Sequence, residues 1–126
     1  MFVVLLSETR KEDIPTAGGK GANLGELVRA GLPVPSGFVI ITTAYDAFVT
    51  HNEFGARLLE LAAQPRPADP ASYDVVSVQI RALFRAGVIP EVVTEEIQRA
   101  YAELSAQVAA DAGGAGAAVA VRSSAT

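Results

Sequence analysis

Short apolar segments alternate with helical apolar patterns along the 126 residues of this chain. Residues 2–6 form a short, β-branched apolar segment bounded by charged residues, which predicts a buried strand. Residues 38–41, which follow a rigid turn at residues 33–37, predict a second strand, and residues 117–122 predict a third. Because these strands are interleaved with helices, the pattern predicts an α/β or α+β fold.

Four helices are predicted by apolar residues spaced three and four positions apart. These apolar positions are, in chain order, Leu24, Leu27 and Val28; Tyr45, Phe48 and Val49; Val76, Ile80, Leu83 and Phe84; and Val93, Ile97, Tyr101, Leu104 and Val108. We expect the first helix to follow a loop through Pro15 and to end at Gly31. Three prolines within residues 64–70 predict the clearest loop, and Gly87 closes the third helix.

Polar residues beside these patterns are assigned to helix ends and to solvent. Thr42 or Thr43 can cap the second helix, and Ser72 or Asp74 can cap the third. Three glutamates of the fourth helix are expected on a solvated face and not at a metal ion: Glu95, Glu96 and Glu103.

Composition narrows the classes of function. Half of the residues are hydrophobic, which is enough for a core, and the length fits one domain or part of one. The net charge of −4 argues against a non-specific binder of nucleic acid or of anionic membranes. There is no cysteine, and the single histidine, His51, cannot build a His-rich metal centre. The first apolar segment is too short for a signal peptide, so we expect a cytoplasmic protein without a membrane span.

The segment Gly18-Gly19-Lys20-Gly21 carries the first candidate chemistry. Its glycines permit a tight turn at a helix start, where free N–H groups attract anions. Lys20 adds a positive charge at that place and is one of only two lysines in the chain. The pattern predicts a ligand that carries phosphate.

This segment matches neither of two familiar phosphate-binding motifs. A Walker A motif needs glycine at position 14 and serine or threonine at position 21, where this chain has Ile14 and Gly21. The spacing of Gly19, Gly21 and Gly25 has one residue too many for a dinucleotide-binding motif. From these residues alone, a closely packed helix start stays open as the alternative.

Arg122 is the second candidate. It stands at the end of the third predicted strand and is followed by Ser123, Ser124 and Thr126. A guanidinium fork with hydroxyl groups beside it suits a phosphate, and a surface salt bridge is the ordinary alternative for a single arginine.

Three blocks in a fixed order resemble a known family. They are residues 18–27 (GGKGANLGEL), residues 31–43 (GLPVPSGFVIITT) and residues 119–126 (VAVRSSAT). Together they resemble the N-terminal ATP-binding region of the phosphoenolpyruvate synthase, pyruvate phosphate dikinase and rifampicin phosphotransferase family. Residues 50–117 fit this family in pattern but are not diagnostic.

The resemblance implies that residues 1–126 are the N-terminal lobe of an ATP-grasp-type nucleotide-binding domain. It places Lys20 and Arg122 at the phosphates of ATP, where cations stabilise charge during phosphoryl transfer. In this family of kinases and phosphotransferases, the β-phosphoryl group of ATP goes to a histidine on a swivelling domain and leaves AMP. The phosphoryl group then goes to pyruvate, in a reaction that consumes water, or to an antibiotic hydroxyl.

The resemblance also implies that these residues are a truncated domain. The second lobe with its Mg²⁺ ligands, the phosphohistidine domain and the acceptor domain have no counterpart in residues 1–126. His51 lacks the surrounding family motif and is assigned to a solvated helix end. We therefore expect weak ATP binding, and no catalytic residue or metal ligand in this chain.

Two alternatives stay open. The acceptor can be pyruvate or a rifamycin-type antibiotic, because the domain that selects it lies outside these residues. The chain can also be a stand-alone nucleotide-binding or interaction module that a second chain completes. Neither nucleic acid nor a membrane is an expected partner.

Overall fold

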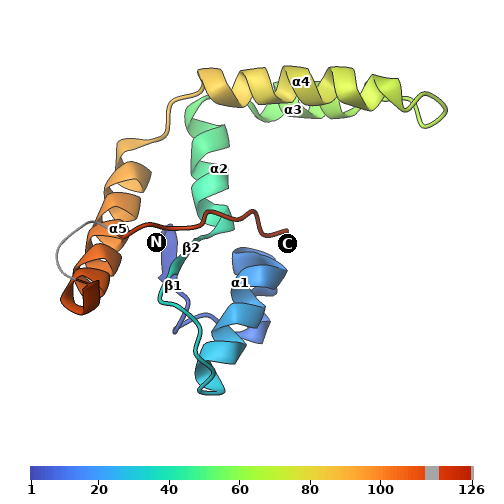
Figure 1. Cartoon of the computed structure of the whole chain (residues 1–126). Helices are drawn as coiled ribbons and strands as arrows, with labels where there is room; N and C mark the ends of the chain where they lie inside the picture. Colours follow the sequence, from blue (N-terminus) through green and yellow to red (C-terminus); the bar gives the residue numbers. More distant parts are fainter. Residues whose placement is uncertain (113–116, 126) are drawn as a thin grey trace. The chain divides into compact units, whose positions relative to one another are not determined.

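The computed structural model describes residues 1–112 and 117–125, with side chains at residues 1–108 and 117–125. The elements in chain order are β1 (Val3–Leu5), the 3₁₀ helix η1 (Lys11–Asp13), α1 (Ile14–Arg29), β2 (Phe38–Ile40), α2 (Thr42–His51), α3 (Gly55–Ala62), α4 (Ala71–Ala86) and α5 (Glu91–Ala112) (Figure 1). They fall into two compact units, of which unit 1 combines Met1–Tyr45 with Glu91–Thr126 and unit 2 is Asp46–Pro90. Helices with a small sheet make a mixed fold that is compatible with the α+β class.

The sheet of unit 1 is antiparallel. β1 pairs with β2 so that Val4 lies opposite Val39. The strands predicted at residues 2–6 and 38–41 are therefore confirmed, with shorter bounds.

The third strand, predicted at residues 117–122, is wrong. In the part of the chain that the structure describes, this segment is not a strand and pairs with neither β1 nor β2. Val119 is 49% exposed and Val121 is 89% exposed. Val119 and Val121 thus do not pack into a core. β-Branched side chains favour a strand mainly when they pack against neighbouring residues, so these valines do little to stabilise one.

α1 begins earlier than the sequence indicated. Pro15 lies in its first turn, where the missing N–H of proline costs no helical hydrogen bond, so the predicted loop through Pro15 is wrong. Gly18 then interrupts the helix with φ 72° and ψ 165°, which places a kink inside α1. The predicted end is confirmed, because α1 finishes at Arg29 and Gly31 follows with φ 75°.

The most buried face of α1 consists of small residues. Gly21 packs against the side chain of Val39 on β2, and Gly25 lies directly against the carbonyl of Thr9. Leu24 and Leu27, which define the expected apolar face, are 38% and 41% exposed. The helix approaches the sheet and the residue 6–9 turn closely because this face lacks bulky side chains.

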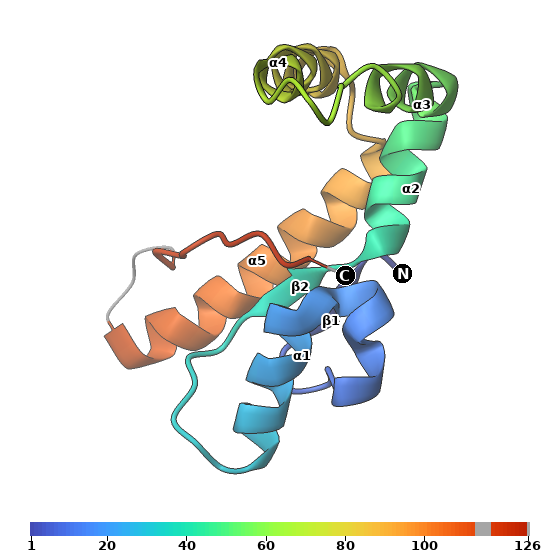
Figure 2. The ribbon, with the colours of Figure 1, turned by 90° about the vertical axis from the view of Figure 1, so that its right-hand side faces the viewer.

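α5 lies against β1 within unit 1 (Figure 2). Its predicted stripe is confirmed at Val93 and Leu104, which are buried. The prediction for Glu96 is wrong, because its carboxylate does not lie on a solvated face. It accepts hydrogen bonds from the backbone N–H groups of Phe2 (2.6 Å) and Val3 (2.8 Å) and so fastens the start of β1 to α5.

Unit 2 is helical and includes the whole of α3, which the sequence analysis did not predict. α3 lies along α4. The predicted inward face of α4 is confirmed, with Val76 buried and Ile80, Leu83 and Phe84 partly buried. The rings of Phe48, Phe54 and Phe84 form a cluster with centroids 5.3 to 6.5 Å apart.

The predicted helix caps are replaced by other contacts. Thr43 Oγ1 donates a hydrogen bond to the carbonyl of Met1 (2.8 Å) and does not cap α2. Ser72 lies inside the first turn of α4, where its hydroxyl donates to the carbonyl of Asp69 (2.6 Å). Gly87 follows the last residue of α4, as predicted.

Candidate phosphate-binding site

The kink in α1 creates a second helix start inside the element. After Gly18 the backbone returns to helical angles, so Gly19, Lys20 and Gly21 occupy the first turn of the continuing helix. The N–H groups of a first turn have no partner in their own helix and carry partial positive charge. This is the helix start that the glycine-lysine segment predicted.

Residues 124 and 125 supply oxygen atoms to these N–H groups. Gly19 N–H donates to the carbonyl of Ala125 (2.9 Å). The hydroxyl oxygen of Ser124 accepts from Lys20 N–H (3.1 Å) and from Gly21 N–H (3.4 Å). The two segments that the sequence analysis singled out, around Lys20 and around Arg122, are therefore neighbours in the fold (Figures 1 and 2).

Gly18 makes this close approach possible. A Cβ atom at Gly18 would overlap the hydroxyl of Ser124 and would lie 2.8 Å from its Cβ and 3.0 Å from the Ala125 carbonyl oxygen. The positive φ of Gly18 is also a conformation that other residues rarely adopt. The glycine at position 18 thus has two causes, the backbone angle and the contact with Ser124.

The opposite end of the same segment is fastened to α5. Tyr101 Oη donates to the carbonyl of Ala117 (2.8 Å), and Ala117 N–H donates to Ser105 Oγ (3.2 Å). The sequence pattern places Tyr101 on the apolar stripe of the fourth predicted helix and gives no role to Ser105. A single hydroxyl within a helix gives no sequence signal for such a contact.

Lys20 and Arg122 both have exposed side chains. Lys20 stands in the first turn after the kink, and Arg122 stands two residues before Ser124. Among the side chains that the structure describes, neither cation has an ion pair within 4.0 Å. Ser123 is exposed, and Thr126 lies outside the described residues. His51 is exposed at the last position of α2, as expected for a helix-end residue.

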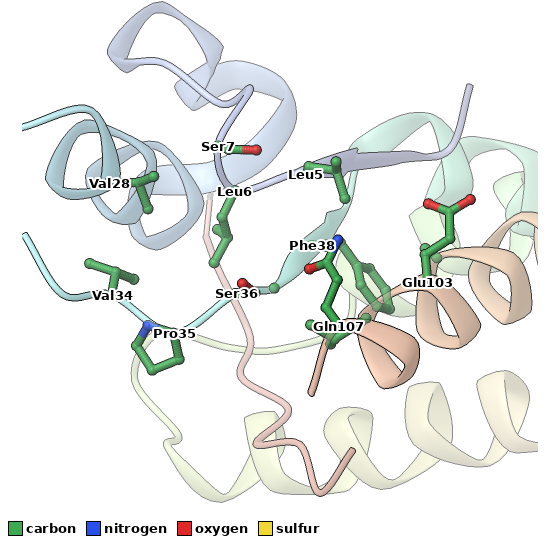
Figure 3. A pocket seen from close by; sticks show the side chains of 13 residues that line it. Leu5, Leu6, Ser7, Val28, Val34, Pro35, Ser36, Phe38, Glu103 and Gln107 are labelled. Carbon is green, nitrogen blue, oxygen red and sulfur yellow. The ribbon is translucent and has the colours of Figure 1, made fainter. Parts of the chain in front are cut away.

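A separate small cavity of about 120 Å³ lies elsewhere in unit 1 (Figure 3). Its walls come from β1 and the following turn, the end of α1, the residue 34–38 segment and α5. None of its lining residues belongs to the glycine turn or to residues 122–125. The candidate site is therefore an open surface formed by two chain segments and does not coincide with this cavity.

The described residues offer no metal-binding cluster. Groups of three or more His, Cys, Asp or Glu side chains placed to hold an ion are absent from them. In the same residues, no helix is long and apolar enough to cross a membrane.

Comparison with known proteins identifies the family of this chain. Residues 14–126 match the family described as the AMP/ATP-binding domain of pyruvate phosphate dikinase. The chain belongs to this family, and the expected resemblance is confirmed.

Its relatives narrow the family further. A probable phosphoenolpyruvate synthase of Methanothermobacter thermautotrophicus is 36% identical over 125 residues, which are 99% of this chain and 18% of the relative. The phosphoenolpyruvate synthase of Pyrococcus furiosus is 36% identical over 157 aligned residues, with 99% of this chain and 19% of the relative covered. A probable phosphoenolpyruvate synthase of Archaeoglobus fulgidus is 39% identical over 126 residues, with 100% and 16% covered.

The chain spans less than a fifth of the length of these relatives. All three carry the name of phosphoenolpyruvate synthase, so the rifampicin phosphotransferase alternative receives no support from them.

Proposed function

We propose that residues 1–126 form part of an ATP-binding domain of the ATP-grasp type, in which Lys20 and Arg122 bind the phosphates of ATP. The family match to an AMP/ATP-binding domain supports a nucleotide as the ligand. The observation that carries the assignment of the two residues is the contact between their segments. The backbone N–H of Lys20 is hydrogen-bonded to Ser124, two residues after Arg122.

The positive charge at this place suits the oxygen atoms of a phosphate. The N–H groups of residues 19–21 are hydrogen-bonded to Ser124 and Ala125, so the attraction for a phosphate comes from the charges around them. The helix start adds partial positive charge, and Lys20 and Arg122 add two full charges that are not consumed by ion pairs with the described side chains. Arg122 offers a planar fork for two phosphate oxygens, whereas Lys20 offers a point charge.

In the complete enzyme these cations serve the first phosphoryl transfer. The relatives are named phosphoenolpyruvate synthases, and the family resemblance implies an overall reaction in which ATP, pyruvate and water give phosphoenolpyruvate, AMP and phosphate. We place the second lobe, the Mg²⁺ ligands, the phosphorylated histidine and the pyruvate site in parts of the enzyme outside residues 1–126. The cytoplasm, where ATP and pyruvate are abundant, is the proposed location.

Calorimetric titration of this chain with ATP tests the binding assignment. Each charge-assisted contact contributes about 1.5–3 kcal/mol, so Lys20→Ala and Arg122→Ala should each weaken ATP binding roughly 10- to 100-fold. Lys11→Ala, at the other lysine, and Arg81→Ala, at an exposed arginine of α4, are the matched controls. The assignment is wrong if the wild-type chain does not bind ATP, or if the site and control variants lose affinity equally.

Catalysis is tested separately. The chain incubated with ATP and pyruvate should release neither AMP nor phosphoenolpyruvate, because the groups that accept the phosphoryl group lie outside these residues. Formation of phosphoenolpyruvate by the purified chain would show that residues 1–126 suffice for the reaction.

A further inference from the structure

We propose that Ser124 is a positioning residue of the phosphate site, whose hydroxyl holds the Arg122 segment at a fixed place beside Lys20. This inference rests on the proposed function, because it assigns Ser124 a role through the two phosphate-binding cations. It adds a residue whose side chain need not touch ATP.

Residues 117–125 are held at their two ends. They belong to no strand, so sheet hydrogen bonds do not fix them. Within the described residues, their hydrogen bonds lie at the two ends: Ala117 is bound to Tyr101 and Ser105, and residues 124 and 125 are bound to the glycine turn. Residues 118–123 between these ends are exposed. Arg122 is only two residues from the second anchor, so its position depends chiefly on that anchor.

The hydroxyl of Ser124 lies close to the backbone of the glycine turn. One hydroxyl oxygen accepts from two successive N–H groups, those of Lys20 and Gly21. A Cβ at position 18 would overlap Ser124 Oγ, so this approach requires glycine at that position. The glycine turn and Ser124 are therefore complementary in shape. The hydroxyl of Ser124 fixes the position of the Arg122 segment along the glycine turn.

The side chain of Ser124 is neutral, which matters for a site that binds phosphate. A carboxylate at position 124 would bind the same N–H groups more strongly, but it would cancel the positive potential of the helix start and repel a phosphate. The neutral hydroxyl of Ser124 makes the connection without adding negative charge. The positive charges of Lys20 and Arg122 then remain available to the ligand.

Hydrogen exchange tests the anchor without any nucleotide. Ser124→Ala removes the acceptor, so the amides of Lys20 and Gly21 should exchange faster than in the wild-type chain. Ser7→Ala, the same substitution at an exposed serine of unit 1, should leave those amides unchanged. Unchanged exchange in Ser124→Ala would overturn the inference at its first step.

Calorimetry then tests whether the anchor acts through Arg122. Loss of one neutral hydrogen-bonding group corresponds to roughly a 3- to 10-fold weakening of ATP and inorganic triphosphate binding in Ser124→Ala. In a double-mutant cycle, Ser124→Ala should have little further effect once Arg122 is alanine, because nothing remains to be positioned. A merely structural serine would instead weaken binding by the same factor in both backgrounds.

The outcomes separate this inference from the proposed function. If Lys20→Ala and Arg122→Ala weaken ATP binding while Ser124→Ala matches the wild type, the positioning role is wrong and the ATP site stands. If neither cation variant changes ATP binding, the proposed function is wrong and the inference fails with it.

Discussion

At the scale of single residues, two glycines share one backbone angle but differ in surroundings. Gly18 has φ 72° and Gly31 has φ 75°. A Cβ at Gly31 would meet nothing within 4 Å, whereas a Cβ at Gly18 would overlap Ser124. Substitution at Gly31 therefore measures the cost of a positive φ without a contact, whereas substitution at Gly18 adds the contact with Ser124 and a ψ of 165°, a combination of angles that is nearly exclusive to glycine.

We predict that Gly18→Ala destabilises the chain more than Gly31→Ala. Adopting a positive φ costs an alanine about 1–2 kcal/mol, and the overlap with Ser124 should add about 1–3 kcal/mol at Gly18. Urea unfolding followed by circular dichroism gives both values, and ATP titration should show weakened binding for Gly18→Ala only. Equal destabilisation by the two substitutions would mean that the contact with Ser124 contributes nothing.

At the scale of elements, Glu96 links α5 to the first strand. The hydrogen bond from Phe2 N–H is the main cause that holds the pKa of Glu96 below its ordinary value of 4.5. The Val3 N–H, the N-terminal amine and Arg99 lower the pKa further, and partial burial of the carboxylate opposes them. The ionised form is thus the one that fastens β1.

We predict that this link weakens in acid. A folded-state pKa below 4.5 means that ionised Glu96 stabilises the fold above that pH. This contribution is lost as the pH falls through the lowered pKa. Glu96→Gln should therefore lower the unfolding free energy at neutral pH and reduce its acid dependence. Glu95→Gln, at the exposed neighbour, is the control, and parallel pH profiles for wild type and Glu96→Gln would contradict the link.

The same link shows what the sequence pattern could and could not predict. The helical stripe of Val93 and Leu104 follows directly from burial at periodic positions, and so was predicted correctly. Glu96 lies beside that stripe, and its carboxylate points toward β1 because the N–H groups of Phe2 and Val3 lie there. A one-dimensional pattern contains no information about such a partner 93 and 94 residues away.

The prediction of a third strand at residues 117–122 was wrong for a related reason. Alternation of valines at 119 and 121 satisfies the strand pattern, but a strand also needs a free sheet edge at the right place. The turn at Gly18 was predicted correctly because a positive φ demands glycine whatever the partner is, whereas the contact of Gly18 with Ser124 is as non-local as that of Glu96. The resemblance to a family then supplied what neither pattern contained, namely the proposal that this turn and Arg122 belong to one site.

At the scale of the whole molecule, the candidate site belongs to one of the two units. Lys20, Arg122 and Ser124, together with the anchors Tyr101 and Ser105, lie in unit 1, while Asp46–Pro90 form unit 2. Unit 2 has its own aromatic cluster and its own fastening, in which Asn52 bonds to the backbone N–H and carbonyl of Val88 (2.8 and 2.9 Å). ATP binding should therefore stabilise the units unequally, because a ligand stabilises the part of a protein that it binds.

Hydrogen exchange with and without saturating ATP measures that inequality in a single experiment. We expect slower exchange in residues 18–25 and 117–125, the two segments that carry Lys20 and Arg122. Peptides from residues 46–90 should exchange at unchanged rates and serve as the internal control. At an ATP concentration that just saturates the wild-type chain, the Lys20→Ala variant should show less protection in both unit 1 segments together, because we propose that the two segments form one site. Protection confined to residues 46–90 would place the nucleotide in unit 2 and contradict the assignment of Lys20 and Arg122.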